Sequence, residues 1–237
     1  MRTALACIAI MAMAILPAFA LQISWDAIAN YGTAMDINHN SHCTAVAWVA
    51  ERHGLQKPRE SDDQFISVAW VYTKKCECHK PDNPTIWRVG FGLGKMFDGR
   101  GKPRPEIDER CRYSSVASER ADWDDYVAAI EADRPVIVTF CYDPATRGSL
   151  ASARRRASDC FSVVGVGYMV YEGQRLLICH DGTDDPAELG KAVQDRVSPQ
   201  AMGINTAGKP WGQSGTSLLK WDGEASNIVL VFPGGMP

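Results

Sequence analysis

Residues 38–54 have the sequence NHNSHCTAVAWVAERHG. Asn40 and Ser41 are of the types that cap helix N-termini, and Gly54 is of the type that ends helices. The sequence therefore predicts a helix that begins at Cys43 and ends before Gly54. Apolar residues recur at i, i+3, i+4 and i+7, which predicts that one helix face is buried. These positions are Cys43, Val46, Ala47 and Ala50.

A cysteine at the start of a helix has a distinct chemical environment. It lies at the positive end of the helix dipole, where backbone N–H groups stabilise a thiolate and lower the pKa of the thiol. This is the local environment of a nucleophilic cysteine, so Cys43 is a candidate nucleophile. Two structural interpretations stay open beside it, because Cys43 also suits one half of a disulfide or a small core residue.

Residues 1–20 have the pattern of a secretory signal peptide, with Arg2 at the start and an apolar run from Ala4 to Pro17. Ala18-Phe19-Ala20 matches a small-x-small cleavage site before Leu21. The run is shorter than a bilayer span, and no later stretch is apolar enough to cross one. We therefore expect cleavage near Ala20, a secreted or periplasmic protein, and no membrane anchor.

The rest of the chain is long enough for one domain with one sizeable core. We expect a single domain over residues 21–237, with a helical lobe at about 21–120 and a sheet lobe at about 121–237. The net charge is −3, which does not indicate a nucleic-acid partner. The basic run at 154–156 is interpreted as a solvated loop. No sequence pattern indicates an oligomeric state.

The cysteine count is informative in an exported protein, where disulfides form. One of the eight cysteines, Cys7, leaves with the signal segment. An odd number then remains, so at least one thiol is unpaired within a monomer, and Cys43 is the natural candidate. The loop-like segment 73–117 needs covalent cross-links to hold one conformation, which favours disulfides from Cys76, Cys78 and Cys111.

The remaining pattern predicts helices first and an antiparallel sheet later, which is the α+β class. Segment 64–72 fits a helix or a strand, and the Pro- and Gly-rich stretch from about 73 to 105 is predicted to be loop. The sequence predicts helices at 122–133 and 187–197, strands at 136–140, 161–170, 176–179 and 227–232, and a hairpin turn at Glu172-Gly173.

Three blocks of the sequence resemble papain-like cysteine peptidases of clan CA, in particular the bacterial double-glycine leader peptidase-like branch. They are Cys43-Thr44-Ala45 at a helix start, the helix and strand from Trp123 to Phe140, and FSVVGVGY at 161–168 followed by ICHDG at 178–182. The third block resembles the family pattern HSVVGVGY followed by hDg. The resemblance covers about half of the predicted mature chain and implies a papain-like fold.

The resemblance implies roles for single residues. Cys43 corresponds to the nucleophile and Asp181 to the acid that orients the base. Phe161 stands where the family has its general-base histidine. His180 adjoins Asp181 and is the best substitute base among the five histidines. Loss of one triad member lowers peptidase activity by orders of magnitude, so the resemblance implies an impaired hydrolase.

Three functional hypotheses follow. The first is a cysteine peptidase that cleaves peptide bonds with a substitute base. The second is a pseudoenzyme that binds a peptide or protein partner without cleavage. The third is a metal or redox protein, although the usual spacing of zinc-binding cysteines is missing. Its ligands would come from His39, His42, Cys43, Cys76, Cys78 and His79. The first two hypotheses require no cofactor.

Overall fold

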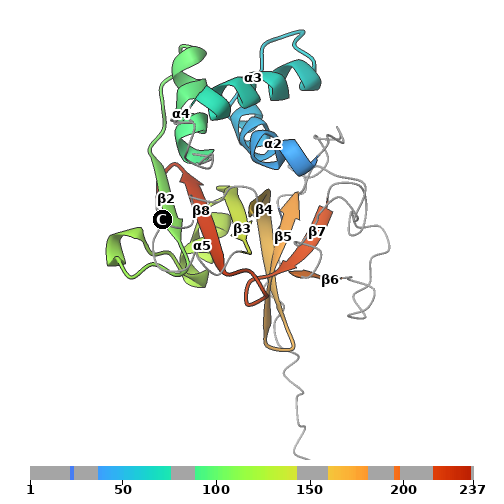
Figure 1. The fold of residues 1–237 in the computed structure, drawn as a ribbon, viewed down its shortest axis with the longest axis vertical. Helices are drawn as coiled ribbons and strands as arrows, with labels where there is room; N and C mark the ends of the chain where they lie inside the picture. Colours follow the sequence, from blue (N-terminus) through green and yellow to red (C-terminus); the bar gives the residue numbers. More distant parts are fainter. Residues whose placement is uncertain are drawn as a thin grey trace, which may run out of the picture.

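A computed structural model describes residues 22–23, 37–75, 89–142, 160–180, 195–197 and 216–235. The described chain forms an antiparallel sheet with helices packed against it, which confirms the predicted α+β class (Figure 1). The helices are α2 (Ile37–Arg52), α3 (Asp62–Lys75), α4 (Val89–Gly99) and α5 (Trp123–Glu131), with a 3-10 turn at Ala117–Glu119. The strands are β1 (Gln22–Ile23), β2 (Ile107–Cys111), β3 (Val136–Cys141), β4 (Cys160–Tyr171), β5 (Gln174–His180), β6 (Arg196–Val197), β7 (Thr216–Lys220) and β8 (Asn227–Pro233).

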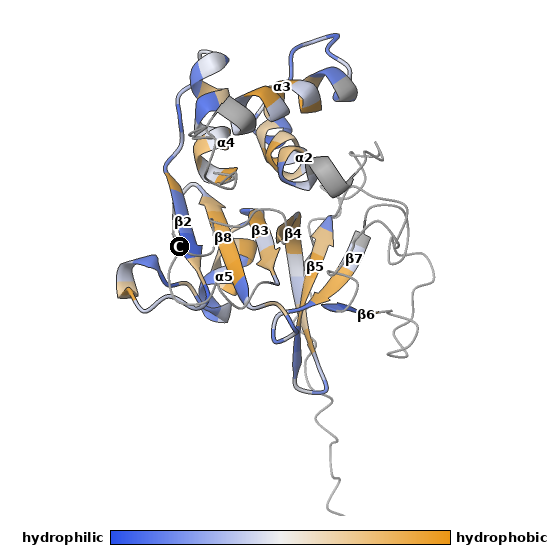
Figure 2. Cartoon of the chain, in the orientation of Figure 1, coloured by the Kyte–Doolittle hydropathy of each residue, from blue (hydrophilic) through white to orange (hydrophobic). Residues whose placement is uncertain are grey.

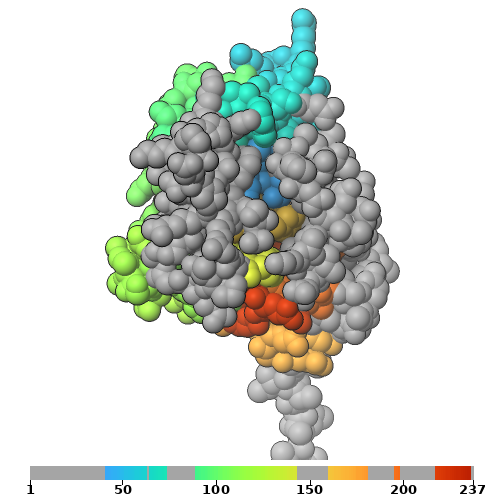
Figure 3. All heavy atoms as spheres, in the orientation of Figure 1, coloured from blue at the N-terminus to red at the C-terminus, as the bar shows by residue number. Residues whose placement is uncertain are grey.

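The strands follow the order β2-β8-β3-β4-β5-β7-β6, and β1 pairs with the second half of β4. The pairings between these strands are antiparallel. The β4–β5 hairpin turns at Glu172 and Gly173, both of which have positive φ angles, as predicted. This turn lies at the end of the molecule opposite to α3 and α4 (Figures 1 and 3).

The central strands are largely hydrophobic, as the colouring in Figure 2 shows, and their buried side chains belong to two cores. All six residues of β3 are buried, which is expected of a strand covered on both faces. One core lies between the sheet and α2, α3 and α4, and contains Ile137 and Val164. The other lies between the sheet and α5, and contains Val138 and Val163. Successive residues of β3 and β4 therefore face opposite cores.

The glycines of β4 allow close packing, as the sequence predicted. The register of β4 against β5 shifts between Gly165 and Gly167. A Cβ at position 165 would lie 2.4 Å from Oη of Tyr126 on α5. The Tyr126 hydroxyl donates a 2.7 Å hydrogen bond to the Gly167 carbonyl. The absence of a side chain at Gly165 thus lets α5 dock directly on the strand.

Helix α2 differs from the prediction at its start and agrees with it at its end. It begins at Ile37 and not at Cys43, so Cys43 lies in its second turn. At the other end, Gly54 has φ +70° and its N–H bonds to the Glu51 carbonyl, while the Leu55 N–H bonds to the Ala50 carbonyl. These two bonds form a Schellman motif, which confirms Gly54 as the terminator.

The segment between α2 and β2 contains more regular structure than predicted. The undecided stretch 64–72 belongs to helix α3. The prediction of loop up to about residue 105 is wrong over 89–99, which form α4. Glycines disfavour isolated helices, but here they permit contact, because a Cβ at Gly92 would lie 2.7 Å from the Thr73 side chain.

The later elements agree with the sequence in most respects. Helix α5 has Asp122 as its N-cap, in a capping box with Asp125, and the four predicted strands are present. The predicted helix at 187–197 is wrong at its end, because Arg196 and Val197 form β6 and pair with β7. The prediction did not include β2 or β7. The predicted signal segment 1–20 and residues 187–194 lie outside the described residues.

Within the described ranges, no helix is long and apolar enough to cross a membrane. A disulfide joins Cys141 at the end of β3 to Cys160 at the start of β4. The two cysteines are register partners in the antiparallel pair. Cys76 and Cys78, for which the sequence predicts disulfides, lie outside the described residues.

Replacement of both Cys141 and Cys160 with serine is expected to lower the free energy of unfolding by about 3 kcal/mol, because the bond restricts the unfolded chain over a separation of 19 residues. Urea denaturation of the variant and the wild type measures the difference. Reduction of the wild type also breaks this bond and should lower its stability by at least as much. Equal stabilities of the variant and the oxidised wild type would contradict the prediction.

Candidate functional site

A chain of buried polar groups joins the first half of α2 to the sheet. Nδ1 of His42 and Oγ of Ser162 on β4 are hydrogen-bonded at 2.5 Å, and Oγ of Ser162 lies 2.6 Å from Oγ1 of Thr139 on β3. The backbone N–H of Ser162 donates to Oγ of Ser41 at 3.3 Å. All four residues are buried. Strand alternation explains the meeting, because Thr139 and Ser162 are register partners that face α2.

A small hollow adjoins this polar chain, between α2 and the ends of β4 and β5. The α2 residues that line it recur at i, i+3, i+4 and i+7, so they share one helix face. The lining residues are Ser41, Thr44, Ala45, Trp48, Ser162, Val163, Val164 and His180.

His180, the predicted substitute base, is the last residue of β5 and lies on the side of the sheet that faces α2. Its ring centroid is 5.7 Å from that of Trp48, and its side chain is buried. The preceding residue, Cys179, faces the opposite core. Strand alternation thus brings His180 to the hollow. Asp181, the predicted orienting acid, lies outside the described residues.

The side chain of Cys43, the predicted nucleophile, packs against helix α3. Its Sγ is 3.2 Å from Oγ1 of Thr73 on α3, and its side chain is fully buried. The Thr73 hydroxyl lies 2.8 Å from the Ala69 carbonyl, to which it donates, and in the contact between Cys43 and Thr73 either group can be the donor. The contact holds the thiol in the interior of the protein, between α2 and α3.

The location of Cys43 within α2 also removes the reason for expecting a helix-dipole effect. The effect of the dipole is confined to the first turn, and Cys43 lies beyond it. Ser41 and Asn40, the predicted capping residues, lie inside the helix. The predicted helix start at Cys43 is therefore wrong, and the role of Cys43 as a nucleophile stays a prediction.

Phe161 does not face α2. It packs in the core on the other side of the sheet, together with Trp123 and Tyr126 of α5. The β4 residue that faces α2 at this level is Ser162, which bonds to His42. A histidine at position 161 would thus point away from the helix that carries Cys43.

His42 is the ionisable group of the polar chain. Burial lowers its pKa to about 4, because the charged imidazolium loses its hydration there. The ring is neutral at pH 7. A general base with such a low pKa removes a proton from a serine hydroxyl inefficiently, and Ser162 is only 1 % exposed. The pair therefore serves chiefly to join α2 to the sheet.

The sequence predictions did not include His42, Ser162 or Thr139 as a group. The sequence did indicate the α2 side of this contact, because Ser41, Ala45 and Trp48 share one helix face. The partners on the sheet required the register of β3 against β4, which a single sequence does not reveal. In the metal hypothesis, Cys76, Cys78 and His79 lie outside the described residues, and the described part of the chain contains no group of three or more potential metal ligands.

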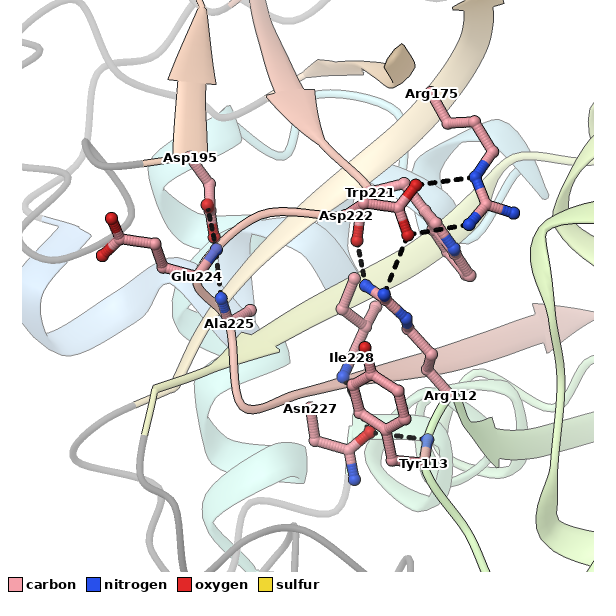
Figure 4. A network of polar contacts seen from close by, with 10 residues as sticks. All are labelled: Arg112, Tyr113, Arg175, Asp195, Trp221, Asp222, Glu224, Ala225, Asn227 and Ile228. Carbon is pink, nitrogen blue, oxygen red and sulfur yellow. Dashed lines mark hydrogen bonds and ion pairs between the residues drawn. The ribbon is translucent and has the colours of Figure 1, made fainter. Parts of the chain in front are cut away.

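A second polar cluster lies on the other side of the sheet, around the turn between β7 and β8 (Figure 4). Asp222 in this turn accepts two hydrogen bonds of 2.7 Å from Arg175 and one of 2.9 Å from Arg112. Arg112 also donates to the Trp221 carbonyl and lies over the ring of Tyr113. Because both guanidinium groups bind the same carboxylate, the cluster joins the β7–β8 turn to β5 and to the residue that follows β2.

Asp195 holds the same turn from its other side (Figure 4). Its buried carboxylate accepts hydrogen bonds from the backbone N–H groups of Glu224, at 2.5 Å, and Ala225, at 3.1 Å. A Cβ at Gly223 would lie 1.8 Å from Oδ1 of Asp195. The turn therefore depends on a glycine, and the carboxylate compensates the N–H groups that the turn leaves unpaired.

No protein-family model matches the sequence, and a comparison with curated proteins returned no match.

Proposed function

We propose that the chain is an exported protein of the papain-like type that binds a peptide or protein partner and does not cleave it with Cys43. The observation that carries the proposal is the contact of the Cys43 thiol with Thr73, at 3.2 Å in the interior of the helical layer. Peptide-bond cleavage needs a thiolate that reaches both a substrate carbonyl and an imidazole. A thiol that is fully buried beside Thr73 does not suit attack on a substrate carbonyl.

Two further observations support the class of protein. A helix carrying a cysteine packs on an antiparallel sheet, which is compatible with the arrangement that the sequence resemblance implies. The Cys141–Cys160 disulfide is compatible with export, since disulfides persist outside the cytosol. The pattern of residues 1–20 is the sequence basis for export.

The hollow between α2 and the ends of β4 and β5 is too narrow to admit a water molecule, and the hydroxyl groups of Ser41 and Ser162 there already hydrogen-bond within the protein. The proposed partner therefore binds outside this hollow.

A second candidate is an active peptidase that uses His180 as its base. One observation favours it: His180 faces α2 and lines the same hollow as Ser41, two residues from Cys43. In this case the side chain of Cys43 would have to turn from Thr73 to the hollow.

Thiol labelling separates the two candidates. We expect iodoacetamide to leave Cys43 unmodified in the native protein, because the side chain is fully buried. Mass spectrometry of tryptic peptides measures the modification. A peptide-library assay should show no cleavage by the wild type and no difference in the Cys43→Ser variant. Rapid labelling of Cys43, together with cleavage that Cys43→Ser abolishes, would establish the peptidase and refute the proposal.

Binding is tested separately with the same peptide library. Peptides that bind the wild type should bind Cys43→Ser with equal affinity, because the side chain of Cys43 is fully buried. A library in which no peptide binds the wild type would contradict the proposal.

A further inference from the structure

The His42–Ser162 contact places an ionisable ring at the joint between the helical layer and the sheet. His42 is 5 % exposed, and its Nδ1 bonds to a serine that is itself bonded to Thr139. Nothing in the proposed function uses this ring. Protonation of the ring would place a positive charge at this buried contact.

We propose that acid pH releases the first half of α2 from the sheet through protonation of His42. The released form exposes the imidazole to water, where the charged ring is hydrated. In the packed form the charged ring stays buried among Ser41, Ser162 and Thr139. The equilibrium therefore favours release when the solution supplies the proton.

The direction and range of the effect follow from proton linkage. The ordinary pKa of histidine is 6.5, and burial lowers that of His42 to about 4. Above pH 6.5 both forms are neutral and pH has no effect. Between pH 6.5 and about 4 the released form binds a proton that the packed form does not. Release then becomes more favourable by about tenfold for each pH unit, and by about 300-fold in total.

Within the described residues, two other ionisable groups lie near this joint. His180 on β5 lines the neighbouring hollow, and Cys43 on α2 faces Thr73 of α3. Strands β3 and β4 present Thr139 and Ser162, whose hydroxyl groups do not titrate in this range. Asp181 follows His180 and lies outside the described residues.

His53, at the other end of α2, offers an internal comparison. Its ring packs edge-on against Phe97 of α4, with centroids 5.4 Å apart. Burial and the charge of Arg52 lower its pKa, so it contributes to acid sensitivity in the same direction. It does not touch the sheet in any described contact, whereas His42 does.

The two cores explain why release can be partial. The core that contains α2 lies on one side of the sheet, and the core that contains α5 lies on the other. The β-sheet hydrogen bonds and the α5 core do not include His42. We therefore expect acid to lower protection in α2 before it does so in α5.

Hydrogen exchange of the full chain as secreted tests the proposal. Exchange is measured by mass spectrometry between pH 7 and about 4.5, with correction for the intrinsic effect of pH on amide exchange. In the wild type, protection of α2 amides should fall by about tenfold per unit below pH 6.5, while α5 stays protected. In His42→Asn, which keeps a polar group near the Nδ1 position and does not titrate, most of this fall should disappear. In His53→Asn it should remain.

Several results would overturn the proposal. Protection of α2 that stays constant from pH 7 to about 4.5 in the wild type would do so without any variant. An equal fall in α2 and α5 would show global unfolding in place of release. A fall that persists in His42→Asn and disappears in His53→Asn would assign the acid-dependent loss of protection to His53, at the other end of α2. The proposal does not depend on whether Cys43 is catalytic.

Discussion

Replacement of Trp221 with alanine is expected to lower the free energy of unfolding by about 4 kcal/mol, the typical cost of removing a large buried aromatic ring. Trp221 is 1 % exposed and lies in the core between the sheet and α5. Its ring centroid is 5.5 Å from that of Trp123 and 6.2 Å from that of Tyr126. Arg112 lies over the same ring at 5.4 Å, so the substitution also removes a cation–π contact (Figure 4).

Chemical denaturation measures this loss, and Trp221→Phe is the matched control. Phenylalanine keeps a ring in the core and should restore more than half of the lost stability. The backbone carbonyl of residue 221 still accepts from Arg112 in both variants, so the hydrogen bond is not the variable. A loss below about 1 kcal/mol for Trp221→Ala would mean that this ring is not a centre of the core.

Replacement of Gly165 with alanine is expected to lower the free energy of unfolding by about 3 kcal/mol. The new Cβ would lie 2.4 Å from Oη and 2.7 Å from Cε2 of Tyr126. Tyr126 is fully buried and bonded to the Gly167 carbonyl, so its ring has little room to move. Overpacking of this kind costs about 1–3 kcal/mol, and loss of the buried hydrogen bond adds to it.

A double-mutant cycle identifies the cause of that loss. Tyr126→Phe removes the oxygen that lies nearest to the new Cβ. The double variant Gly165→Ala/Tyr126→Phe should therefore lose at least about 1 kcal/mol less than the sum of the two single losses. If the losses simply add, the contact between α5 and Gly165 does not limit packing at this position.

The elements that the sequence predicted well have local signals. Helix α5 begins directly after its N-cap Asp122, whose side chain accepts from the N–H groups of Asp124 and Asp125. These contacts involve neighbours in the sequence and need no tertiary structure. The β4–β5 hairpin is similar, because Glu172 and Gly173 adopt the positive φ angles that a tight turn requires.

Helix α4 shows where local signals fail. Its glycines predict a loop, yet the segment is helical because the neighbouring helix comes close enough to fill the space above Gly92 and Gly99. Thr73 and Tyr72 of α3 supply the contacts. Packing thus outweighs the low helix propensity of glycine, and packing depends on residues distant in the sequence.

The cysteines also show which features the sequence indicates and which depend on tertiary structure. The sequence indicated disulfides in an exported chain, and Cys141–Cys160 is present. The sequence did not indicate this pair, because the partners follow from the register of β3 against β4. The sequence placed Cys43 at a helix start, whereas the helix begins at Ile37 and Cys43 lies in its second turn.

The sequence by itself determined the α+β class, the capped helix α5, the buried strands β3, β4, β5 and β8, and the presence of Cys43 and His180 on elements that later meet. Periodicity and capping are properties of short stretches, so one sequence contains them. Only the tertiary structure decided that Cys43 faces Thr73, that Phe161 faces α5, and that His42 joins Ser162. These outcomes depend on helix rotation and strand register, and both are set by contacts between residues far apart in the chain.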